Sequence, residues 1–324
     1  MLKIGLIGAG HLGKIHLRLL KEIKEFELIG FYDHDEPHTF LAEKEFGVKG
    51  FRSFEELAAK VDVIDIVTPA VSHYEYANAS LRMSKHIFIE KPLTFSTDEA
   101  RVLVALASEA NVRVQVGHVE RFNPAFVAAR PFIKSPIFIE SKRFAQYNPR
   151  GMDVSVVMDV MIHDIDIVLN IVKSPVKRIT ASGMNIIGKT ADMVNARLEF
   201  DNGCAANLTA CRVGIENKRE LMIFQNDACI TIDFLGRRTN VISLKSKPGT
   251  IDGEEFAREL ATRKGGDILK FEAPPIIETN AIKSELESFA QAIISNSETL
   301  VTVEDGFDAV NIANKIDKNL NLKV

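Results

Sequence analysis

Four polar residues recur at helical spacing within the otherwise apolar segment MDVMIHDIDIVLN, residues 158–170. Asp159, His163, Asp166 and Asn170 fall within about 60° of one another around an α-helix. An imidazole, whose ordinary pKa lies near neutrality, can take a proton from a hydroxyl, and a carboxylate one turn away can orient it. The alternative is a helix with one solvated polar edge. Asp164 lies off this stripe, and we expect it to be a charge on the helix surface.

A glycine-rich turn near the N-terminus offers a second kind of chemistry. The segment GAGHLG follows an apolar strand pattern and opens a helical pattern, which is the setting that a dinucleotide-binding turn needs. Its glycines permit a tight turn, let a pyrophosphate approach the backbone and let the helix pack closely. Unpaired N–H groups at the helix start attract the anion. The candidate cofactor-binding residues of this turn are Gly8, Ala9, Gly10, His11, Leu12 and Gly13.

Asp33 ends the second strand pattern, in IGFYDHD, about 20 residues after the last glycine of the turn. A carboxylate at this place accepts hydrogen bonds from a ribose 2′-hydroxyl and repels a 2′-phosphate, so the sequence favours NAD over NADP. The alternative is a glycine-rich turn followed by a surface aspartate. That alternative does not explain why strand, glycines, helix and acid occur in register.

Ligands of a doubly wound sheet lie beyond the carboxyl ends of its strands, so the residues at those ends are further candidates. Thr68 and Pro69 follow the strand pattern VIDIV, and Glu90 and Lys91 follow HIFI. Pro92 biases Lys91 toward extended or turn geometry, and a fixed ammonium there could polarise a substrate hydroxyl or carbonyl. A solvated lysine at a strand end is the alternative.

Five side chains have roles that the sequence leaves open. His73 could cap the following helix or contact NAD. Arg121, in GHVERFNP, could bind a phosphate or carboxylate of the substrate, although we favour a structural role that ties two domains together. Tyr147 and Arg150 precede the segment 158–170 in a loop that could reach substrate. Asp166, further along the polar stripe, could bind a substrate hydroxyl or anchor the helix.

The first 120 residues, which we expect to form the NAD-binding domain, alternate strand and helix patterns. The strand patterns are KIGLIG, ELIGFYD, VIDIVTP, HIFIEKP and VRVQVGH, and the helix patterns lie near 11–24, 37–46, 73–83 and 97–110. Ser72 and Ser96 precede two of these helices as expected N-caps, and Glu99 completes a capping-box spacing after Ser96. The alternation predicts an α/β fold with a doubly wound parallel sheet.

Residues 121–324 show a different pattern, which predicts a substrate-binding α+β domain. The strand pattern PIFIESKRFA precedes the segment 158–170, and β-type runs follow it to about residue 245. The turn Asp201–Gly203 is a hairpin signal, and sequential hairpins predict a largely antiparallel sheet. Residues 245–279 read as an irregular excursion. Helical patterns at 280–296 and 303–320 close the chain, and we expect them to pack back on the first domain.

The composition excludes several classes of function. The chain has 324 residues, a net charge of −4 and a pI near 6.1, without a basic stripe or tail for nucleic acid or a membrane surface. Its three cysteines lack metal-ligand spacing, and their odd number argues against a disulfide framework, so we expect a reducing cytoplasm. We expect neither a secretory leader nor a membrane span, because no apolar run is long enough.

Several of these motifs together resemble the glucose–fructose oxidoreductase / inositol dehydrogenase / rhizopine-catabolism family (Gfo/Idh/MocA). They are GLIGAGHLG, Asp33, VTPAVSHYEYA, EKPL, Asp159-x-x-x-His163, SELESFAQAI and VTVEDGFDAVNIA. The resemblance implies a Rossmann domain and a second domain with a large, open, mostly antiparallel sheet that often forms a homo-oligomer interface, giving a dimer or tetramer. It also implies that Lys91, Asp159 and His163 are catalytic. Met161 departs from the glycine that many members have two residues after the aspartate.

The segments GHVERFNP and DVMIHDID are most similar to members that act on nucleotide-linked amino sugars, such as UDP-N-acetylglucosamine 3-dehydrogenases. The resemblance therefore implies that His163 removes a proton from a secondary hydroxyl while hydride passes to NAD, and that Lys91 stabilises the oxygen. Asp159 would orient Lys91 or the imidazole. Two alternatives stay open: an NAD-binding sensor or regulatory protein without turnover, and a reductase of imines or double bonds.

Overall fold

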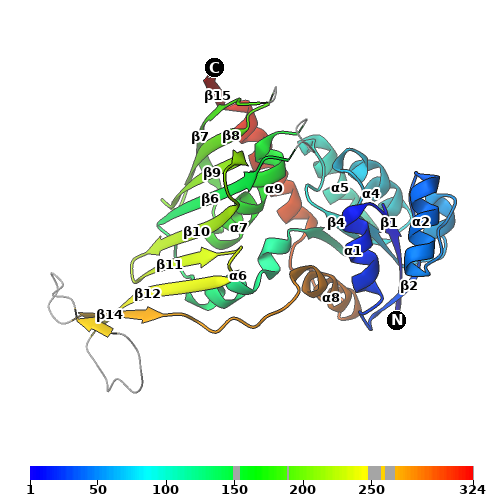
Figure 1. Cartoon of the computed structure of the whole chain (residues 1–324), viewed down its shortest axis with the longest axis horizontal. Helices are drawn as coiled ribbons and strands as arrows, with labels where there is room; N and C mark the ends of the chain where they lie inside the picture. The colour runs from blue at the N-terminus through cyan, green and yellow to red at the C-terminus, as the bar shows by residue number, and fades with distance from the viewer. Residues whose placement is uncertain (149–153, 188–189, 247–256, 260–266, 324) are drawn as a thin grey trace. The chain divides into compact units, whose positions relative to one another are not determined.

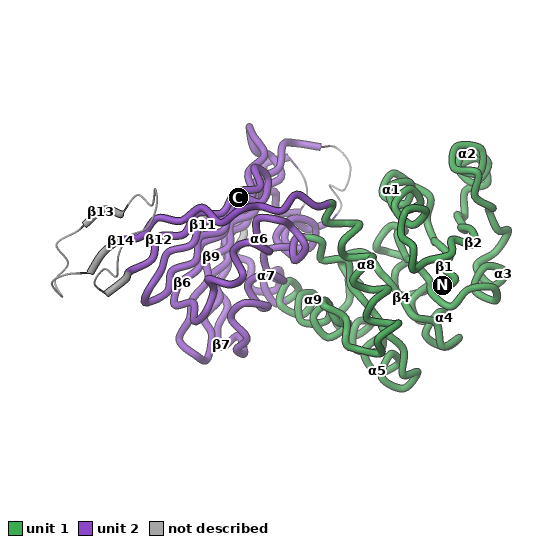
Figure 2. Tube along the Cα trace, turned by 90° about the horizontal axis from the view of Figure 1, so that it is seen from below, with its two compact units in different colours: residues 1–119, 280–314 green, residues 120–279, 315–324 purple. Residues whose placement is uncertain are grey.

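The computed structural model describes residues 1–148, 154–187, 190–246, 257–259 and 267–323 (Figure 1). Its internal contacts divide the chain into two compact units, coloured separately in Figure 2. Unit 1 comprises residues 1–119 and 280–314, and unit 2 comprises residues 120–279 and 315–324. The segment 280–314 therefore groups with the N-terminal residues rather than with the residues that precede it in the sequence.

Unit 1 is built on a five-stranded parallel sheet with the strand order β2-β1-β3-β4-β5. Its strands are β1 (Leu2–Ile7), β2 (Phe26–Tyr32), β3 (Val63–Ile66), β4 (His86–Glu90) and β5 (Val114–Gly117). The order changes direction between β1 and β3, so the carboxyl ends of these two strands flank the position where doubly wound sheets bind ligands. The predicted parallel sheet is confirmed.

The helices of unit 1 are α1 (His11–Leu20), α2 (Glu36–Phe46), α3 (Phe54–Ala58), α4 (His73–Arg82), α5 (Thr97–Ala110), α8 (Ala281–Ile294) and most of α9 (Val303–Lys318). Ser96 caps α5 as predicted, because its hydroxyl accepts hydrogen bonds from the N–H groups of Asp98 and Glu99. Ser72 is the N-cap residue of α4 as predicted, but its side chain makes no capping hydrogen bond. A 3₁₀ turn, Ala70–Ser72, runs directly into α4, and the Ser72 hydroxyl instead donates to the carbonyl of Pro69.

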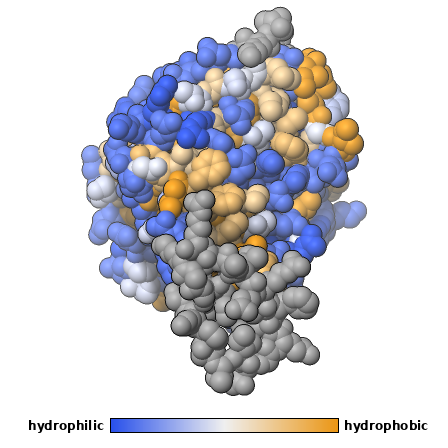
Figure 3. Space-filling view, turned by 90° about the vertical axis from the view of Figure 1, so that its left-hand side faces the viewer, coloured by the Kyte–Doolittle hydropathy of each residue, from blue (hydrophilic) through white to orange (hydrophobic). Residues whose placement is uncertain are grey.

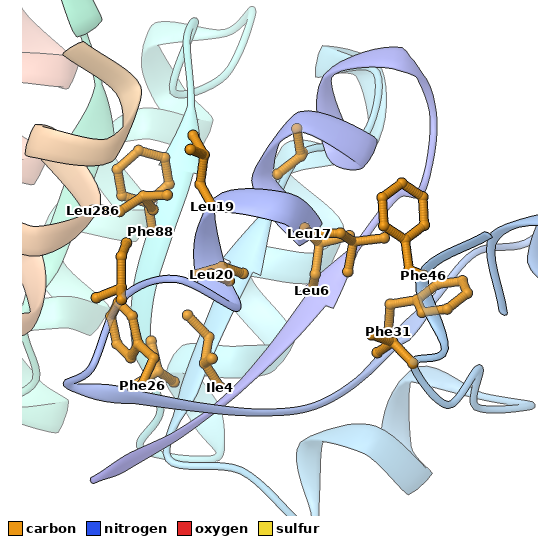
Figure 4. Close-up of a cluster of buried hydrophobic side chains, with 14 of the residues drawn as sticks. Ile4, Leu6, Leu17, Leu19, Leu20, Phe26, Phe31, Phe46, Phe88 and Leu286 are labelled. Carbon is orange, nitrogen blue, oxygen red and sulfur yellow. The ribbon is translucent and has the colours of Figure 1, made fainter. Parts of the chain in front are cut away.

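One face of this sheet is covered by α1 and α8, whose apolar side chains form the cluster drawn in Figure 4. Leu17 and Leu20 of α1, Phe88 of β4 and Leu286 of α8 are almost wholly buried there. Burying an aliphatic or aromatic side chain contributes roughly 1.5–3 kcal/mol, so this cluster fixes α1 against the sheet. The glycine turn that precedes α1 is fixed with it.

Unit 2 contains a ten-stranded sheet with the order β13-β14-β12-β11-β10-β6-β9-β8-β7-β15. Neighbouring strands are antiparallel except for β6 with β9 and β7 with β15, which confirms the prediction of a mostly antiparallel sheet. The first six strands along the chain are β6 (Phe138–Gln146), β7 (Val176–Met184), β8 (Met193–Phe200), β9 (Ala205–Gly214), β10 (Lys218–Gln225) and β11 (Ala228–Asp233). The predicted hairpin turn joins β8 to β9, with Gly203 at φ +86°.

The expectation that residues 245–279 are irregular is wrong in part. Residues 247–256 and 260–266 lie outside the described residues, residues 273–279 form neither helix nor strand, and the rest of the range belongs to three of the four remaining strands. The four are β12 (Arg238–Ser246), β13 (Ala257–Glu259), β14 (Asp267–Glu272) and β15 (Leu320–Lys323). Strand β14 pairs with both β12 and β13. Lys270 and Glu272 lie on one face of β14 with their charged groups 2.8 Å apart, so the charges that suggest an irregular segment belong to a strand near the sheet edge.

Helices α6 (Pro124–Ala129) and α7 (Ile162–Val172) pack against one face of this sheet. The opposite face is turned to the viewer in Figure 3, where hydrophobic residues lie among hydrophilic ones. A single π-helical segment, Val157–Met161, leads directly into α7, and short 3₁₀ turns lie at Val119–Phe122 and Arg130–Phe132. Within the described part of the chain, no helix has the length and apolar character that a bilayer crossing requires.

Candidate active site

The glycine turn of unit 1 has a steric reason for Gly8 and Gly13, and it leaves open space at Gly10. Gly8 adopts φ +95°, which residues with side chains rarely adopt. A Cβ on Gly13 would lie 1.8 Å from the carbonyl oxygen of Gly8, whereas a Cβ on Gly10 would meet nothing within 4 Å. The N-terminus of α1 has neither a side-chain cap nor an acidic residue in its first turn. The turn therefore presents open space and uncapped N–H groups, which fit the pyrophosphate of a dinucleotide.

A cavity of about 480 Å³ lies beside this turn, between the loops that follow β1, β2 and β3. Its lining includes Gly8, Gly10, Asp33, Thr68 and Pro69, which the sequence analysis selects as cofactor-binding candidates. The hydroxyl of Thr68 is buried and has no hydrogen-bond partner among the described residues. A cavity of this size, lined by the glycine turn and by Asp33 at the carboxyl ends of the strands, suits a bound nucleoside, so the residues present fit a dinucleotide.

Asp33 has a structural contact that the sequence does not reveal. Its Oδ2 accepts a hydrogen bond of 2.7 Å from the N–H of Ala9, and its Oδ1 accepts one of 3.0 Å from the N–H of Asp35. The carboxylate therefore holds the end of β2 to the glycine turn while it also lines the cavity. Among the other turn residues, His11 is exposed, Leu12 is partly buried and Ala9 is buried.

His73 joins the two loops at the ends of β3 and β4. It is buried, its Nδ1 lies 2.8 Å from the carbonyl oxygen of Pro92, and its Nε2 lies 2.9 Å from that of Thr68. Burial lowers the pKa of His73, although the two carbonyl partners oppose that effect. Since carbonyls face both ring nitrogens, the geometry supports a role in positioning these loops rather than a contact with NAD. The bond from Lys91 to Pro92 is cis, and Lys91 itself is partly buried.

The polar stripe of unit 2 is not one continuous α-helical face. Asp159 lies in the π-helical segment, whereas His163, Asp166 and Asn170 lie in α7. The wider turn of the π segment changes the angle between Asp159 and the others, so the arc of about 60° applies only within α7. Asp159, His163 and Asn170 are partly buried, but Asp166 is almost wholly buried. The four residues of the stripe therefore differ in the exposure of their side chains and in the type of helix that carries them.

Asp166 and Arg121 form a buried bidentate ion pair within unit 2. Arg121 donates from Nε to Oδ2 at 2.8 Å and from Nη2 to Oδ1 at 2.6 Å, and the two side chains are 7% and 1% exposed. The pair ties α7 to the turn Val119–Phe122. Both residues are candidates for substrate binding by sequence, and this geometry supports a structural role for both of them.

Asp164 corrects the expectation of a surface charge, since it is only 3% exposed. Arg143 of β6 donates to Asp164 Oδ1 at 2.9 and 2.8 Å, and to Glu120 Oε1 at 2.8 Å. Burial alone lowers the pKa of Arg143, but Asp164 and Glu120 raise it well above its ordinary value. This second ion pair fixes the residue next to His163. The sequence signal for it is weak: Arg143 occupies an inward position in the alternation of β6.

The loop before the π segment is only partly described. Tyr147 is 50% exposed, and Arg150 lies outside the described residues. Sequence reasoning also misses a buried group in unit 1 that contains His16, Asp65 and Glu90. Its signal is Asp65, a carboxylate within the short apolar strand VIDI, where a charge needs a partner.

Comparison with known proteins agrees with this architecture. Residues 2–118 match the model of the GFO/IDH/MocA oxidoreductase family, NAD-binding Rossmann fold, and residues 98–231 match the GFO/IDH/MocA C-terminal domain. The chain is 31% identical over 296 residues to UDP-N-acetylglucosamine 3-dehydrogenase of Acidithiobacillus ferrooxidans, covering 91% of this chain and 90% of that one. It is 25% identical to inositol 2-dehydrogenase of Rhizobium meliloti over 96% of this chain and 94% of that one.

A solved structure of the Acidithiobacillus ferrooxidans UDP-N-acetylglucosamine 3-dehydrogenase superposes on the chain with a TM-score of 0.88. The match has 30% sequence identity and covers 98% of this chain and 97% of that one. The glycine turn, the two sheets and the near-complete alignment thus lead to one conclusion: the chain belongs to the GFO/IDH/MocA family of NAD(P)-dependent oxidoreductases.

Proposed function

We propose that the protein is a dehydrogenase of a nucleotide sugar, which oxidises a secondary hydroxyl of the UDP-N-acetylglucosamine type. The observation that carries the substrate class is the likeness to UDP-N-acetylglucosamine 3-dehydrogenase, which extends over nearly the whole of both chains. It includes the second domain, which we expect to bind the substrate. The same likeness makes a free inositol a less suitable substrate, because the inositol dehydrogenase is less similar.

The proposed reaction uses His163 as the general base and Lys91 as the group that stabilises the reacting oxygen. His163 takes the proton of the substrate hydroxyl at a ring nitrogen, while the Lys91 ammonium donates a hydrogen bond to the oxygen and favours its alkoxide character. Asp159 orients the imidazole or the ammonium by its negative charge. When bound, the nicotinamide supplies the hydride acceptor.

The buried ion pairs that Asp164 and Asp166 of α7 make support this assignment through preorganisation. Asp164 and Asp166 follow His163 in the sequence by one and three residues, and each is held by a buried arginine. The helix backbone that carries His163 is thereby fixed in two places. A general base must be held within a few tenths of an ångström of its productive position, and fixed neighbours achieve this.

We propose NAD rather than NADP as the cofactor, with Asp33 as the discriminating residue. The Asp33 carboxylate lines the cavity beside the glycine turn, and its negative charge opposes a 2′-phosphate. Thr68 and Pro69 line the same cavity, while Glu90 and Lys91 follow at the end of the next strand. A homo-oligomeric state, dimer or tetramer, and a cytoplasmic location remain predictions from the sequence.

The test measures absorbance of the reduced nicotinamide with UDP-N-acetylglucosamine, other UDP-sugars, free sugars and inositol. We expect turnover with UDP-N-acetylglucosamine, and a loss of about 10²- to 10⁴-fold in kcat for His163→Ala with unchanged NADH binding. Asn170→Ala, on the same helix, is the matched control and should stay within a few-fold of wild type. Turnover of His163→Ala within a few-fold of wild type would show that another group is the base. Turnover of free sugars alone would refute the substrate class.

A further inference from the structure

A group of four ionisable side chains lies in the interior of unit 1, and the proposed reaction does not use it directly. The group comprises His16 of α1, Asp65 of β3, Glu90 of β4 and Glu285 of α8. His16, Asp65 and Glu285 are 0% exposed and Glu90 is 9% exposed. Burying ionised groups costs several kcal/mol unless they are paired, so a group of this kind needs a specific reason.

The strand register explains how the sheet contributes its part of the group. Asp65 pairs with Phe88 across β3 and β4, and Glu90 pairs with Gly117 across β4 and β5. Because strand residues alternate between faces, Asp65, Phe88 and Glu90 share the face that α1 and α8 cover. The ring of Phe88 contacts the ring of His16, with centroids 5.8 Å apart. The helix α1 thus places His16 directly over the two acids.

His16 lies between two carboxylates. Its Nδ1 is 2.9 Å from Asp65 Oδ2, and its Nε2 is 3.4 Å from Glu90 Oε1, an ion-pair distance rather than a full hydrogen bond. Burial lowers the pKa of His16, but Asp65 and Glu90 raise it more, and it lies well above its ordinary value. A carboxylate faces each ring nitrogen, so the geometry favours the imidazolium form, in which one N–H is directed at each acid.

Glu90 continues this chain of contacts to Lys91. The other oxygen of Glu90, Oε2, lies 3.3 Å from the backbone N–H of Lys91, which donates to it. A Cβ on Gly117 would lie 3.0 Å from the Cδ and both oxygens of Glu90, so the carboxylate rests against backbone that has no side chain. His16 on one side and Gly117 on the other hold the carboxylate in place.

Glu285 is the fourth ionisable side chain of the group. Neither of its carboxyl oxygens has a hydrogen-bond partner among the described residues. Burial raises the pKa of Glu285 well above its ordinary value, and the negative charges of Glu90 and Asp65 raise it further. Both effects favour the protonated, neutral form of Glu285. In the described part of the chain, no three His, Cys, Asp or Glu residues are placed to hold a metal ion.

We propose that Asp65 and His16 are positioning residues of the active site, which hold the Glu90 carboxylate and through it the backbone of Lys91. The proposal rests on the proposed function, in which the Lys91 ammonium contacts the reacting oxygen. The titratable groups that face His16 are Asp65 from β3, Glu90 from β4 and Glu285 from α8, and the neighbouring Phe88 is apolar. The chain Asp65–His16–Glu90–Lys91 thus depends on one protonated ring.

The test compares wild type with Asp65→Asn, which keeps the shape of the side chain and removes its charge. We expect the pKa of His16 to fall, because burial remains while one of the two acids that raise it is lost. At alkaline pH the neutral ring then lacks the positive charge that attracts the Glu90 carboxylate, so it holds Glu90 less firmly. The kcat of the variant should fall about 10- to 100-fold there, with NADH affinity unchanged, and should recover as the pH is lowered. Asp98→Asn, in an exposed ion pair, is the control and should retain the wild-type pH profile.

A second readout does not depend on turnover. In protein labelled with ¹³C-histidine and ¹⁵N-lysine, the ring signal of His16 and the amide signal of Lys91 are followed by NMR as pH changes. We expect both signals of Asp65→Asn to titrate together, at lower pH than in wild type. His16→Gln removes the ring signal of His16 and so identifies it. If Asp65→Asn does not fold, His16→Gln replaces it in the test, and the Lys91 amide signal of His16→Gln should differ from that of wild type at all pH values.

The outcomes separate this proposal from the proposed function. A Lys91 amide that does not follow the His16 ring overturns the proposal, as does a kcat profile of Asp65→Asn that matches wild type although the His16 titration has moved. Absence of turnover by the wild-type protein with every substrate refutes the proposed function instead. In that case the NMR titration still decides whether His16 controls the backbone of Lys91.

Discussion

Replacing Arg121 with Met tests whether helix α7 is held by a buried ion pair rather than used to bind substrate. The substitution keeps most of the apolar volume of the side chain and removes the guanidinium. Asp166, which is 1% exposed, would then remain as a buried carboxylate without its bidentate partner. Such an uncompensated charge is much less stable than either an intact pair or an apolar replacement of both residues.

The size of the effect follows from this burial. Removing one partner of a buried ion pair costs about 3–5 kcal/mol in the free energy of unfolding. In a unit of this size each kcal/mol lowers the unfolding midpoint by roughly 2–4 °C, so we expect a decrease of about 6–20 °C. The double variant Arg121→Met/Asp166→Leu removes both charges, and its stability should lie within about 1 kcal/mol of wild type or exceed it.

The assay is thermal and urea unfolding of wild type, both single variants and the double variant, analysed as a double-mutant cycle. Arg101→Met is the matched control, because Arg101 and Asp98 form an ion pair whose side chains are 63% and 88% exposed. We expect no measurable change in stability for this control, since exposed pairs of this kind contribute little.

Two results would refute the reasoning. One is an Arg121→Met variant with a free energy of unfolding within about 1 kcal/mol of wild type. The other is a double variant in which the losses of the single variants simply add. Either result, combined with a large increase in the KM for the sugar, would return Arg121 and Asp166 to the group of substrate-binding residues.

Three further predictions concern unit 1. Gly13→Ala should lower NADH affinity at least about tenfold, measured by fluorescence, because the new Cβ would lie 1.8 Å from the Gly8 carbonyl oxygen; wild-type affinity would contradict this. Glu285→Gln should flatten the dependence of thermal stability on pH. The folded state holds the Glu285 proton to higher pH than the unfolded state, so wild-type stability falls as pH rises above the ordinary glutamate pKa. A Glu285→Gln variant whose stability depends on pH as steeply as that of wild type would disprove the raised pKa of Glu285. Asp33→Ser should lower the ratio of NADH affinity to NADPH affinity at least about tenfold, because it removes the negative charge that opposes a 2′-phosphate. It should also weaken NADH binding, because Asp33 accepts a hydrogen bond from Ala9. A constant ratio would exclude Asp33 as the discriminating residue.

The sequence predicts the local features of this fold well because their causes are local. Apolar runs separated by amphipathic segments predict the five parallel strands, and Ser96 with Glu99 predicts the start of α5. The glycine turn follows from the steric limits on Gly8 and Gly13 and from the open space at Gly10. Lys91 and His163 can be proposed as catalytic residues from the sequence, because each belongs to a short motif whose spacing is visible in the chain.

The order of the strands and the partners of the buried charges depend on contacts between distant residues. Arg121 and Asp166 are 45 positions apart, and His16 and Asp65 are 49 positions apart, so no window of sequence shows that they meet. Asp164 reads as a surface charge for the same reason: its partner Arg143 lies on another element. The sequence alone thus determines the two kinds of sheet, the glycine turn and the residues capable of chemistry. Only the tertiary structure decides which charges are buried together, because pairing compensates the cost of burial and pairing requires the folded chain.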